Sequence, residues 1–350
     1  MESPPLPETS ASPANDSNAD HSTDIVLRNK QPLQPALNES INPQARLLFH
    51  HFSECIAPLM VVLDSMSNGY KHIIVPLACQ DECLGRAVAV VAAFHLAQGA
   101  PEMRQVAEVG HQAIIEKLRR DAVQLRLGQV FNPFTLATIL VLLVGETITG
   151  ASNYGYLLEM LACLTQSPET IQALPPALRD FFWQQVKMFQ LFGLPLSNEV
   201  KGLEILNGSP VTYLEFMSYP DLTPSSEHYA NIQLIRAATL SAGAIYRRRV
   251  ESSITQYESI HLVEQLRQTV LGLKNVKGTH ALVWTYFIGA AESFLPEHRE
   301  FFSERLNALY AYTRFGSIPA ALEALKTVWA EQGVRRWTDV VVSDTPILVM

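Results

Sequence analysis

The chain has 350 residues, of which 48% are hydrophobic and 17% charged, and its formal net charge is −8. This length is enough to bury a substantial core, in one large domain or two of ordinary size. The acidic balance excludes non-specific binding of nucleic acid by the whole chain, which would need a basic face to displace counterions, but it leaves a local basic patch open.

Residues 1–40 differ from the rest of the chain. They contain six of the 21 prolines, many serines, threonines and asparagines, and no aromatic side chain. Such a segment cannot bury enough apolar surface to offset its ordering entropy, so it is predicted to be a disordered, acidic, proline-rich tail. The cluster Ile25-Val26-Leu27 beside Asp24 is either a short interaction motif or, as the composition favours, part of a plain flexible tail. Residues 41–350 are predicted to form the helical domain.

From Asn42 onward the spacing of apolar residues predicts helices. The stripes in the first two thirds of the chain are Leu48, Phe52, Cys55, Ile56 and Leu59; Leu84, Ala87, Val88, Val91, Ala92 and His95; and Ile232, Ile235, Thr239, Ala242 and Tyr246. Ala89 and Val90 on the opposite face of the second stripe indicate a helix that is buried all round. Residues 135–144 are apolar but too few to cross a bilayer, which needs about 20 residues, so a buried helix is expected there and no membrane association.

Near the C-terminus, Pro296 and then Ser317 with Pro319 are signals for the start of two helices. Their buried stripes are predicted to be Phe302, Leu306 and Leu309, and then Leu322, Leu325 and Trp329. Strand-like alternation is scarce, and β-branched runs occur only at 340–342 and 347–349. The predicted fold class is therefore all-α: a large irregular bundle of about ten to thirteen helices with a disordered N-terminal tail, and with a soft seam between residues 194 and 226.

No motif for catalysis or cofactor binding occurs in the sequence. It contains no Gly-x-Ser-x-Gly elbow, phosphate loop, dinucleotide fingerprint or His-Glu-x-x-His helix. The nearest approach, residues 150–155 (GASNYG), is one residue too long for a nucleophile elbow, and a turn between two helices explains it better. The chain is therefore predicted not to be an enzyme, to have no catalytic or cofactor-binding residues, and to need no cofactor.

Metal binding has three weak candidates. Cys79 and Cys83 are four residues apart and share a helix face, His51 and Cys55 have the same spacing, and His50 lies alongside. Two ligands on one helix are half a site, and no second pair completes either one. The four cysteines, which include Cys163, are expected to be reduced and mostly buried thiols of an intracellular protein, with no metal bound.

Two basic runs and an aromatic cluster are candidate binding surfaces. Residues 117–120 (KLRR) and 247–249 (RRR) fall late in predicted helices, where cations complement the helix dipole, so solvated helix ends are favoured over a phosphate-binding face. Phe181, Phe182, Phe189 and Phe192 repeat at helical spacing. They are expected to be core residues, with a small-molecule pocket as the alternative.

Six stretches of the chain carry a family resemblance. They are residues 48–59, 74–96, 135–146, 284–292, 297–302 and 321–329. The most specific is 284–292 (WTYFIGAAE), a helix with tryptophan, small residues and glutamate. In their order and spacing these stretches resemble the fungal-specific transcription factor domain, the helical region that follows the zinc cluster in many fungal regulators. The resemblance covers roughly residues 45–335.

The resemblance implies a regulator of transcription, often of metabolic genes, that resides in the nucleus. The family's DNA-binding module holds two zinc ions with six cysteines, whereas this sequence has four cysteines, the first at Cys55. Direct sequence-specific DNA binding is therefore not carried over, although a cluster encoded upstream of this sequence stays open. The expected partners are protein partners, either a second copy of the chain or a zinc-cluster transcription factor.

A stand-alone effector-binding or scaffold module without direct DNA contact, in the nucleus or the cytoplasm, is the alternative function. Nothing in the family pattern assigns site residues. Structural roles are expected for Trp284, Glu292, Arg299 and Trp329, with Glu292 and Arg299 forming a partly buried pair across the turn at Pro296.

Overall fold

The computed structural model describes residues 43–66, 68–124, 132–152, 154–165, 174–251, 255–273 and 278–350. These residues form fifteen α-helices and no strand, so the predicted all-α class is confirmed. The tail predicted for residues 1–40 lies outside the described residues. Ser40–Met350 forms one compact unit. The described helices outnumber the ten to thirteen predicted because several are short segments.

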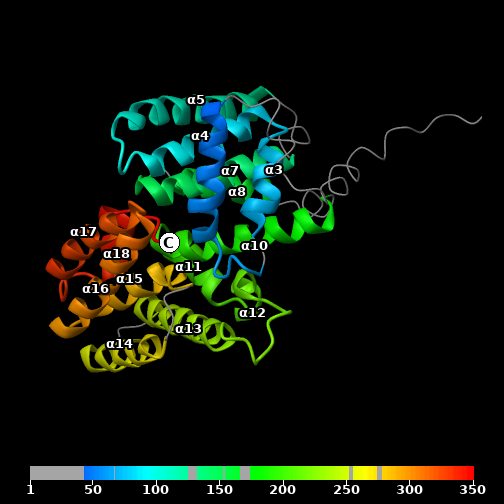
Figure 1. Ribbon diagram of the computed structural model, residues 1–350. Coiled ribbons are helices and arrows are strands. Elements are labelled where there is room, and N and C mark those ends of the chain that lie inside the picture. Colours follow the sequence, from blue (N-terminus) through cyan, green and yellow to red (C-terminus); the bar gives the residue numbers. More distant parts are fainter. Residues whose placement is uncertain are drawn as a thin grey trace, which may run out of the picture. The chain divides into compact units, whose positions relative to one another are not determined.

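The helices follow one another along the described chain without a regular repeat (Figure 1). Their bounds are α2 (Pro43–His51), α3 (Val75–Ala78), α4 (Glu82–Leu96), α5 (Glu102–Gln124), α7 (Pro133–Thr149), α8 (Tyr154–Thr165), α10 (Pro176–Gly193), α11 (Glu199–Leu206), α12 (Pro210–Tyr213), α13 (Tyr229–Glu251), α14 (Gln256–Leu271), α15 (Val283–Glu292), α16 (Pro296–Thr313), α17 (Ser317–Ala330) and α18 (Trp337–Asp344).

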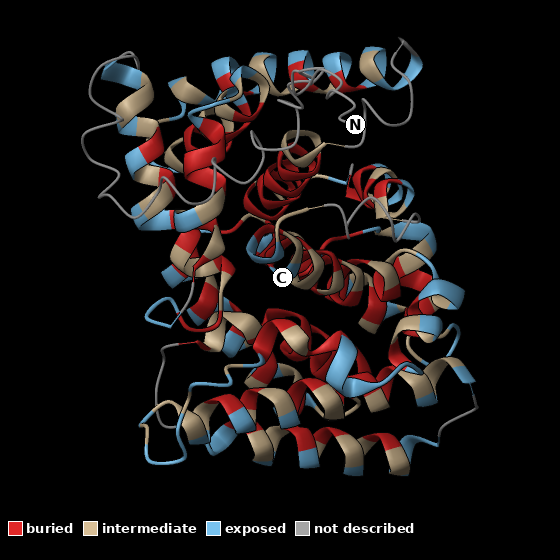
Figure 2. Ribbon diagram, turned by 90° about the vertical axis from the view of Figure 1, so that its right-hand side faces the viewer, coloured by how far each residue is buried: buried red, intermediate tan, exposed pale blue. Residues whose placement is uncertain are grey.

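Two helices form the centres of packing. α7 is buried continuously from Leu136 to Ile148, as the apolar run predicts, and it packs against α4 and α8. All residues of α15 are buried, and this helix packs against α13, α14, α16 and α17. Buried residues accordingly lie along the faces that the helices turn toward one another (Figure 2). No helix among the described residues is long and apolar enough to span a membrane.

α10 connects the N-terminal helices to the middle of the chain. It contacts α7 and α8 on one side and α11 and α12 on the other (Figure 1). Its aromatic residues Phe181, Phe182, Phe189 and Phe192 are all buried, so their predicted place in the core is confirmed. The proposed seam at 194–226 consists of the short helices α11 and α12 with two 3₁₀ turns, and it lies within the unit Ser40–Met350.

Polar side chains fix where several helices begin. Asp81 Oδ1 accepts a hydrogen bond from Leu84 N at 2.8 Å at the start of α4, and Asn132 Oδ1 accepts one from Thr135 N at 2.8 Å at the start of α7. Thr255 and Glu258 form a reciprocal capping box at the start of α14. These contacts satisfy amide groups that have no partner within the helix.

The predicted stripes differ from the observed ones in three places. Residues 46–63 do not form one α-helix: a π-helical turn, Phe52–Ile56, follows α2, and a 3₁₀ turn, Ala57–Met60, follows it. Of the predicted stripe, Phe52 and Ile56 are buried, whereas Cys55 is exposed and Leu48 and Leu59 are half-buried. Phe49 and Met60 are buried instead. In α4 the stripe is confirmed, but Ala89 and Val90 are only half-buried, so the helix is not buried all round.

The C-terminal helices begin where predicted, at Pro296 and Ser317. The stripe of α16 is confirmed, and so is that of α13. In α17 the buried apolar residues are Ile318, Ala321, Ala324, Leu325 and Val328. The predicted stripe is therefore displaced by one residue at Leu322 and Trp329, which are half-buried. The valine run 340–342 is helical and belongs to α18.

Candidate functional site

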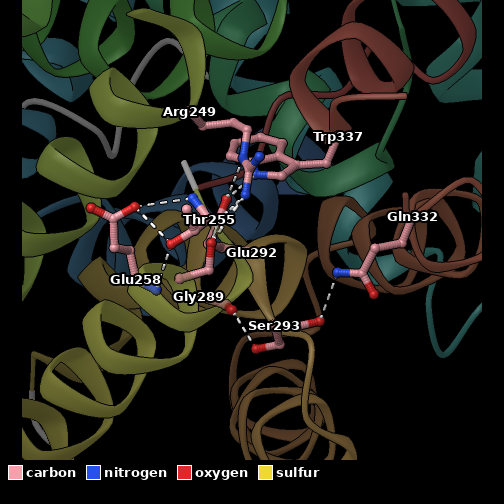
Figure 3. A network of polar contacts seen from close by, with 9 residues as sticks. Arg249, Thr255, Glu258, Gly289, Glu292, Ser293, Gln332 and Trp337 are labelled. Carbon is pink, nitrogen blue, oxygen red and sulfur yellow. Dashed lines mark hydrogen bonds and ion pairs between the residues drawn. The ribbon is translucent and has the colours of Figure 1, made fainter. Parts of the chain in front are cut away.

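The last residue of α15, Glu292, is a fully buried carboxylate. Arg249, near the end of α13, donates to both of its oxygens, from Nε to Oε2 at 2.9 Å and from its second guanidinium nitrogen to Oε1 (Figure 3). Only 13% of the Arg249 side chain is exposed. The two residues therefore form a bidentate, desolvated ion pair, the strongest geometry for an arginine and a carboxylate.

Two further donors complete the hydrogen bonding of Glu292. Ser259 Oγ on α14 donates to Oε1 at 2.5 Å, and Trp337 Nε1 at the start of α18 donates to Oε2 at 2.7 Å. Arg249 also donates to Ser259 Oγ at 3.1 Å. We call Arg249, Ser259, Glu292 and Trp337 the Glu292 cluster. It joins α13, α14, α15 and α18 at one point, and both carboxylate oxygens are occupied by donors.

The expected pair between Glu292 and Arg299 is wrong. Arg299 Nε instead donates to the main-chain oxygen of Ser293 at 3.1 Å, and the guanidinium group also bonds to Gln332 and lies 5.1 Å from the ring centre of Trp329. Gln332 Nε2 donates to the same Ser293 oxygen at 3.1 Å (Figure 3). Arg299 therefore ties α16 to the end of α15 through main chain and a ring face, with no carboxylate.

The tryptophans have the structural roles that the sequence suggested. Trp329 Nε1 donates to the main-chain oxygen of Ala290 at 2.9 Å, which fixes α17 against α15. Trp284 is completely buried, and its ring centre lies 6.1 Å from that of Phe192. Among the described residues, Trp284 Nε1 has no hydrogen-bond partner. These contacts and the Glu292 cluster hold α15 in place.

In the basic run 247–249, Arg248 is exposed as predicted, but Arg249 is not a solvated cation. Arg249 forms an ion pair with Glu292, and Arg248 lies 3.8 Å from Glu258. The run therefore offers no continuous positive face. In the run 117–120, Lys117 pairs with Asp121 at 2.5 Å and Arg119 lies 5.3 Å from the ring centre of Tyr156. The run 117–120 is therefore a partly neutralised helix surface, as predicted. The expectation of a solvated side chain is wrong for Arg249, because this side chain points into the core.

The cysteines are not mostly buried, which corrects the expectation. Cys55, Cys79 and Cys163 are exposed, and Cys83 is half-buried. Burial raises the pKa of the half-buried thiol of Cys83. Cys79 follows the end of α3 and Cys83 lies in α4, so the expectation that they share a helix face is wrong. Within the described residues no group of three or more histidine, cysteine or acidic side chains is arranged to hold a metal ion.

His51 meets a histidine and not Cys55. Its Nε2 lies 2.9 Å from Nδ1 of His95, whose Nε2 lies 3.0 Å from the main-chain oxygen of Thr313. A carbonyl oxygen only accepts, so His95 must carry its proton on Nε2, and its Nδ1 accepts from His51. This fixed arrangement links α2, α4 and the end of α16. No spacing in the sequence connects residues so far apart.

Residues 150–152 lie in the connection between two helices, where a turn is predicted. α7 ends at Thr149, Gly150 has a left-handed φ of 70°, and α8 begins at Tyr154. A Cβ atom at Gly150 would lie 2.5 Å from the main-chain oxygen of Gly316, so the backbone of another segment passes directly over the turn. Ser152 therefore lies in a helix connection and not in a nucleophile elbow.

A cavity of about 240 Å³ lies beside α10. Phe181 and Phe192 line this cavity and are also buried in the core. The aromatic cluster was predicted to be core, with a small-molecule pocket as the alternative, and the structure contains both features. The other lining residues, among them His280, carry no signal in the sequence that would have identified them.

Comparison with known proteins identifies one family. The model described as fungal specific transcription factor domain matches residues 46–168 and 217–350, which together make up more than half of the chain. No curated protein and no solved structure matches the chain. The second matched segment contains the whole Glu292 cluster. The first contains α4 and α7, whereas α10 lies in the unmatched segment between the two.

Proposed function

Because this chain belongs to the family with the fungal-specific transcription factor domain, we propose that it is a nuclear transcriptional regulator that acts through protein contacts and not through its own contact with DNA. The observation that carries this proposal is the family match over residues 46–168 and 217–350. The resemblance of the sequence to fungal regulators of metabolism extends the proposal to metabolic genes as targets.

Electrostatics supports the second half of the proposal. The chain is net acidic at −8, and binding to phosphates requires cations that are free to displace counterions. In the two basic runs, the side chains of Lys117, Arg248 and Arg249 already face carboxylates. Reading a base sequence also requires side chains that a rigid element presents to a groove, and these runs offer no such row.

The surface of α5 supports contact with another protein. Val106 and Val109 are three residues apart on this helix, and 73% and 66% of their respective surfaces are exposed. Residues three apart lie on the same helix face, so the two valines form a small apolar patch. We propose that this patch contributes to pairing with a like domain, in a second copy of the chain or in a zinc-cluster transcription factor.

A reporter assay tests the proposal. The full chain is fused to an unrelated DNA-binding domain, and transcription from a promoter with that domain's site is compared with the unfused domain. We expect the fusion to change transcription. Val106→Asp with Val109→Asp should abolish the change, whereas Val211→Asp, at a position that is 73% exposed on α12, should leave it intact.

A second measurement separates the two halves of the proposal. The purified chain without the fusion is titrated against labelled promoter DNA at physiological salt. Weak binding without sequence preference is expected. Tight, sequence-selective binding would overturn the claim that the chain acts without its own DNA contact, and a fusion that leaves transcription unchanged would overturn the regulatory role itself.

A further inference from the structure

The cavity beside α10 has a mostly apolar lining. Its walls include Phe181, Met188 and Phe192 of α10, together with Met60 and Phe216 from other segments. All five of these side chains are buried. Aromatic and methionine side chains give a wall that is polarisable and adapts to the shape of a bound molecule. Its volume of about 240 Å³ is below the usual range for drug-sized ligands, so it fits a compact molecule.

The wall at Phe181 depends on a glycine. A Cβ atom at Gly69 would lie 2.1 Å from Cδ2 of Phe181, so the ring packs directly over the glycine backbone. Any larger residue at this position would push the ring toward the cavity. Because Gly69 has no side chain, the ring of Phe181 lies against its backbone and does not fill the cavity.

Two polar side chains at the cavity have incomplete hydrogen bonding. Gln185 is buried, and its Oε1 accepts from the hydroxyl group of Tyr70 at 2.9 Å. No described residue accepts from its amide N–H groups. His280 Nε2 lies 2.8 Å from the main-chain oxygen of Val61, so this nitrogen carries the proton and donates. The other nitrogen, Nδ1, is then a buried acceptor that has no partner among the described residues.

The charge of the lining restricts the ligand further. Among the described residues that line the cavity there is no lysine or arginine, and the carboxylate of Asp221 stands at an exposed position of the lining. Burial lowers the pKa of His280, so its ring stays neutral at physiological pH. An anionic ligand would lose its hydration here without gaining a cation. By contrast, a larger cavity of about 550 Å³ is lined by side chains of both charges, among them Lys117, Asp121 and Glu159. Its lining therefore favours neither anionic nor cationic ligands.

We propose that this cavity is a binding site for a compact, uncharged and mostly apolar molecule that accepts a hydrogen bond from the Gln185 amide. α10 lies in the segment that the family model does not match, so the family match assigns nothing to this part of the lining. The proposal is independent of the regulatory role.

A pair of fluorescent probes with one aromatic skeleton tests the site. N-phenylnaphthylamine is uncharged and carries an N–H donor, and anilinonaphthalene sulfonate adds an anionic group to the same rings. Titrated into the full chain, the uncharged probe should bind saturably, with one probe per chain, at least about tenfold more tightly than the sulfonate. Binding without saturation, or equal affinity for the two probes, would overturn the proposal.

Variants place the probe in the cavity. Ala281→Phe adds a ring to the lining and should weaken the uncharged probe by about tenfold or more, whereas Ala330→Phe adds the same ring at an exposed position of α17 and should not. Met66, which is 39% exposed, also lines the cavity, so Met66→Trp narrows it without entering the core and should weaken binding as well. The thermal midpoint of each cavity variant is compared with that of Ala330→Phe to check that the variant is folded. A folded cavity variant that binds the uncharged probe with wild-type affinity would show that the probe binds elsewhere.

Discussion

Arg249 and Glu292 are 43 residues apart in the chain, yet the guanidinium group of one contacts both carboxylate oxygens of the other. The carboxylate is fully buried, and only 13% of the arginine side chain is exposed. Each charge is therefore stable in the core only because the other is present. This pair, with Ser259 and Trp337, decides how α13, α14 and α18 pack around α15.

Glu292→Gln is expected to destabilise the protein by about 3–5 kcal/mol, because it leaves the buried Arg249 cation without a counter-charge. Arg249→Met should cost a similar amount for the converse reason. The double variant should lose clearly less than the sum of the two single variants, since the second substitution removes the charge that the first leaves unpaired. Urea unfolding of the four proteins measures these free energies.

Arg299→Met is the matched control for this cycle. Arg299 also lies near the end of α15, but it bonds to Ser293 and Gln332 and not to Glu292. Its effect should therefore add to that of Glu292→Gln within a few tenths of a kcal/mol, roughly as for independent sites. A strong coupling between Glu292 and Arg299, with none between Glu292 and Arg249, would contradict the observed pairing.

Gly150→Ala should be clearly more destabilising than Gly333→Ala. Both glycines have a left-handed φ, 70° and 90°, so alanine costs roughly 1 kcal/mol at either position. At Gly150, however, the new Cβ atom would lie 2.5 Å from the main-chain oxygen of Gly316, whereas nothing lies within 4 Å of it at Gly333. Thermal unfolding of the two variants compares them directly. Equal midpoints would show that the contact with Gly316 relaxes freely.

The parts of the fold that the sequence predicted are those with local causes. The apolar run of α7, the proline at the start of α16 and the stripe of α13 each depend on residues within one segment, and all three are confirmed. The stripe at 46–63 is confirmed only at Phe52 and Ile56, while Cys55, within the π-helical turn Phe52–Ile56, is exposed. Periodicity assumes a uniform helix, so it cannot show such a turn.

The candidate sites could not be predicted for a different reason. Glu292 was expected to pair with Arg299, seven residues away, because proximity in sequence is the only distance that a sequence contains. Its partner in the structure is Arg249, which belongs to the run 247–249. Three neighbouring arginines in that run suggested a solvated surface. Whether a cation at a helix end faces water or the core depends on which helix packs beside it, here α15. The orphan acceptor of His280 is equally invisible until Val61 is placed beside it.

Elemental analysis of the dialysed full chain should find less than one zinc ion per molecule. Cys79 follows the end of α3 and Cys83 lies in α4, so the two do not share a helix face, and within the described residues no three metal-binding side chains converge. Stoichiometric zinc that survives dialysis would contradict this prediction. An exposed thiol that reacts with a cysteine reagent, by contrast, is expected at Cys55.

Acidification should destabilise the protein through His95. Burial lowers its pKa below the ordinary value of 6.5, and the hydrogen bond to Thr313 opposes this only in part. Below that ordinary pKa the unfolded chain binds more protons than the folded chain, so the stabilisation present above it is lost as the pH falls through the lowered value. The free energy of unfolding should therefore decrease from about pH 7.5 to about pH 5.5.

The geometry gives the reason for this loss and a way to isolate it. His95 Nδ1 accepts from His51, so a proton on Nδ1 would set two donors against each other. In His95→Gln the amide can supply one donor and one acceptor but does not titrate, so the decrease in unfolding free energy on acidification should become smaller. His261→Gln, at an exposed position of α14, should leave the decrease unchanged. An identical pH dependence in His95→Gln and the wild type would assign the acid sensitivity to other groups, such as the buried ring of His280.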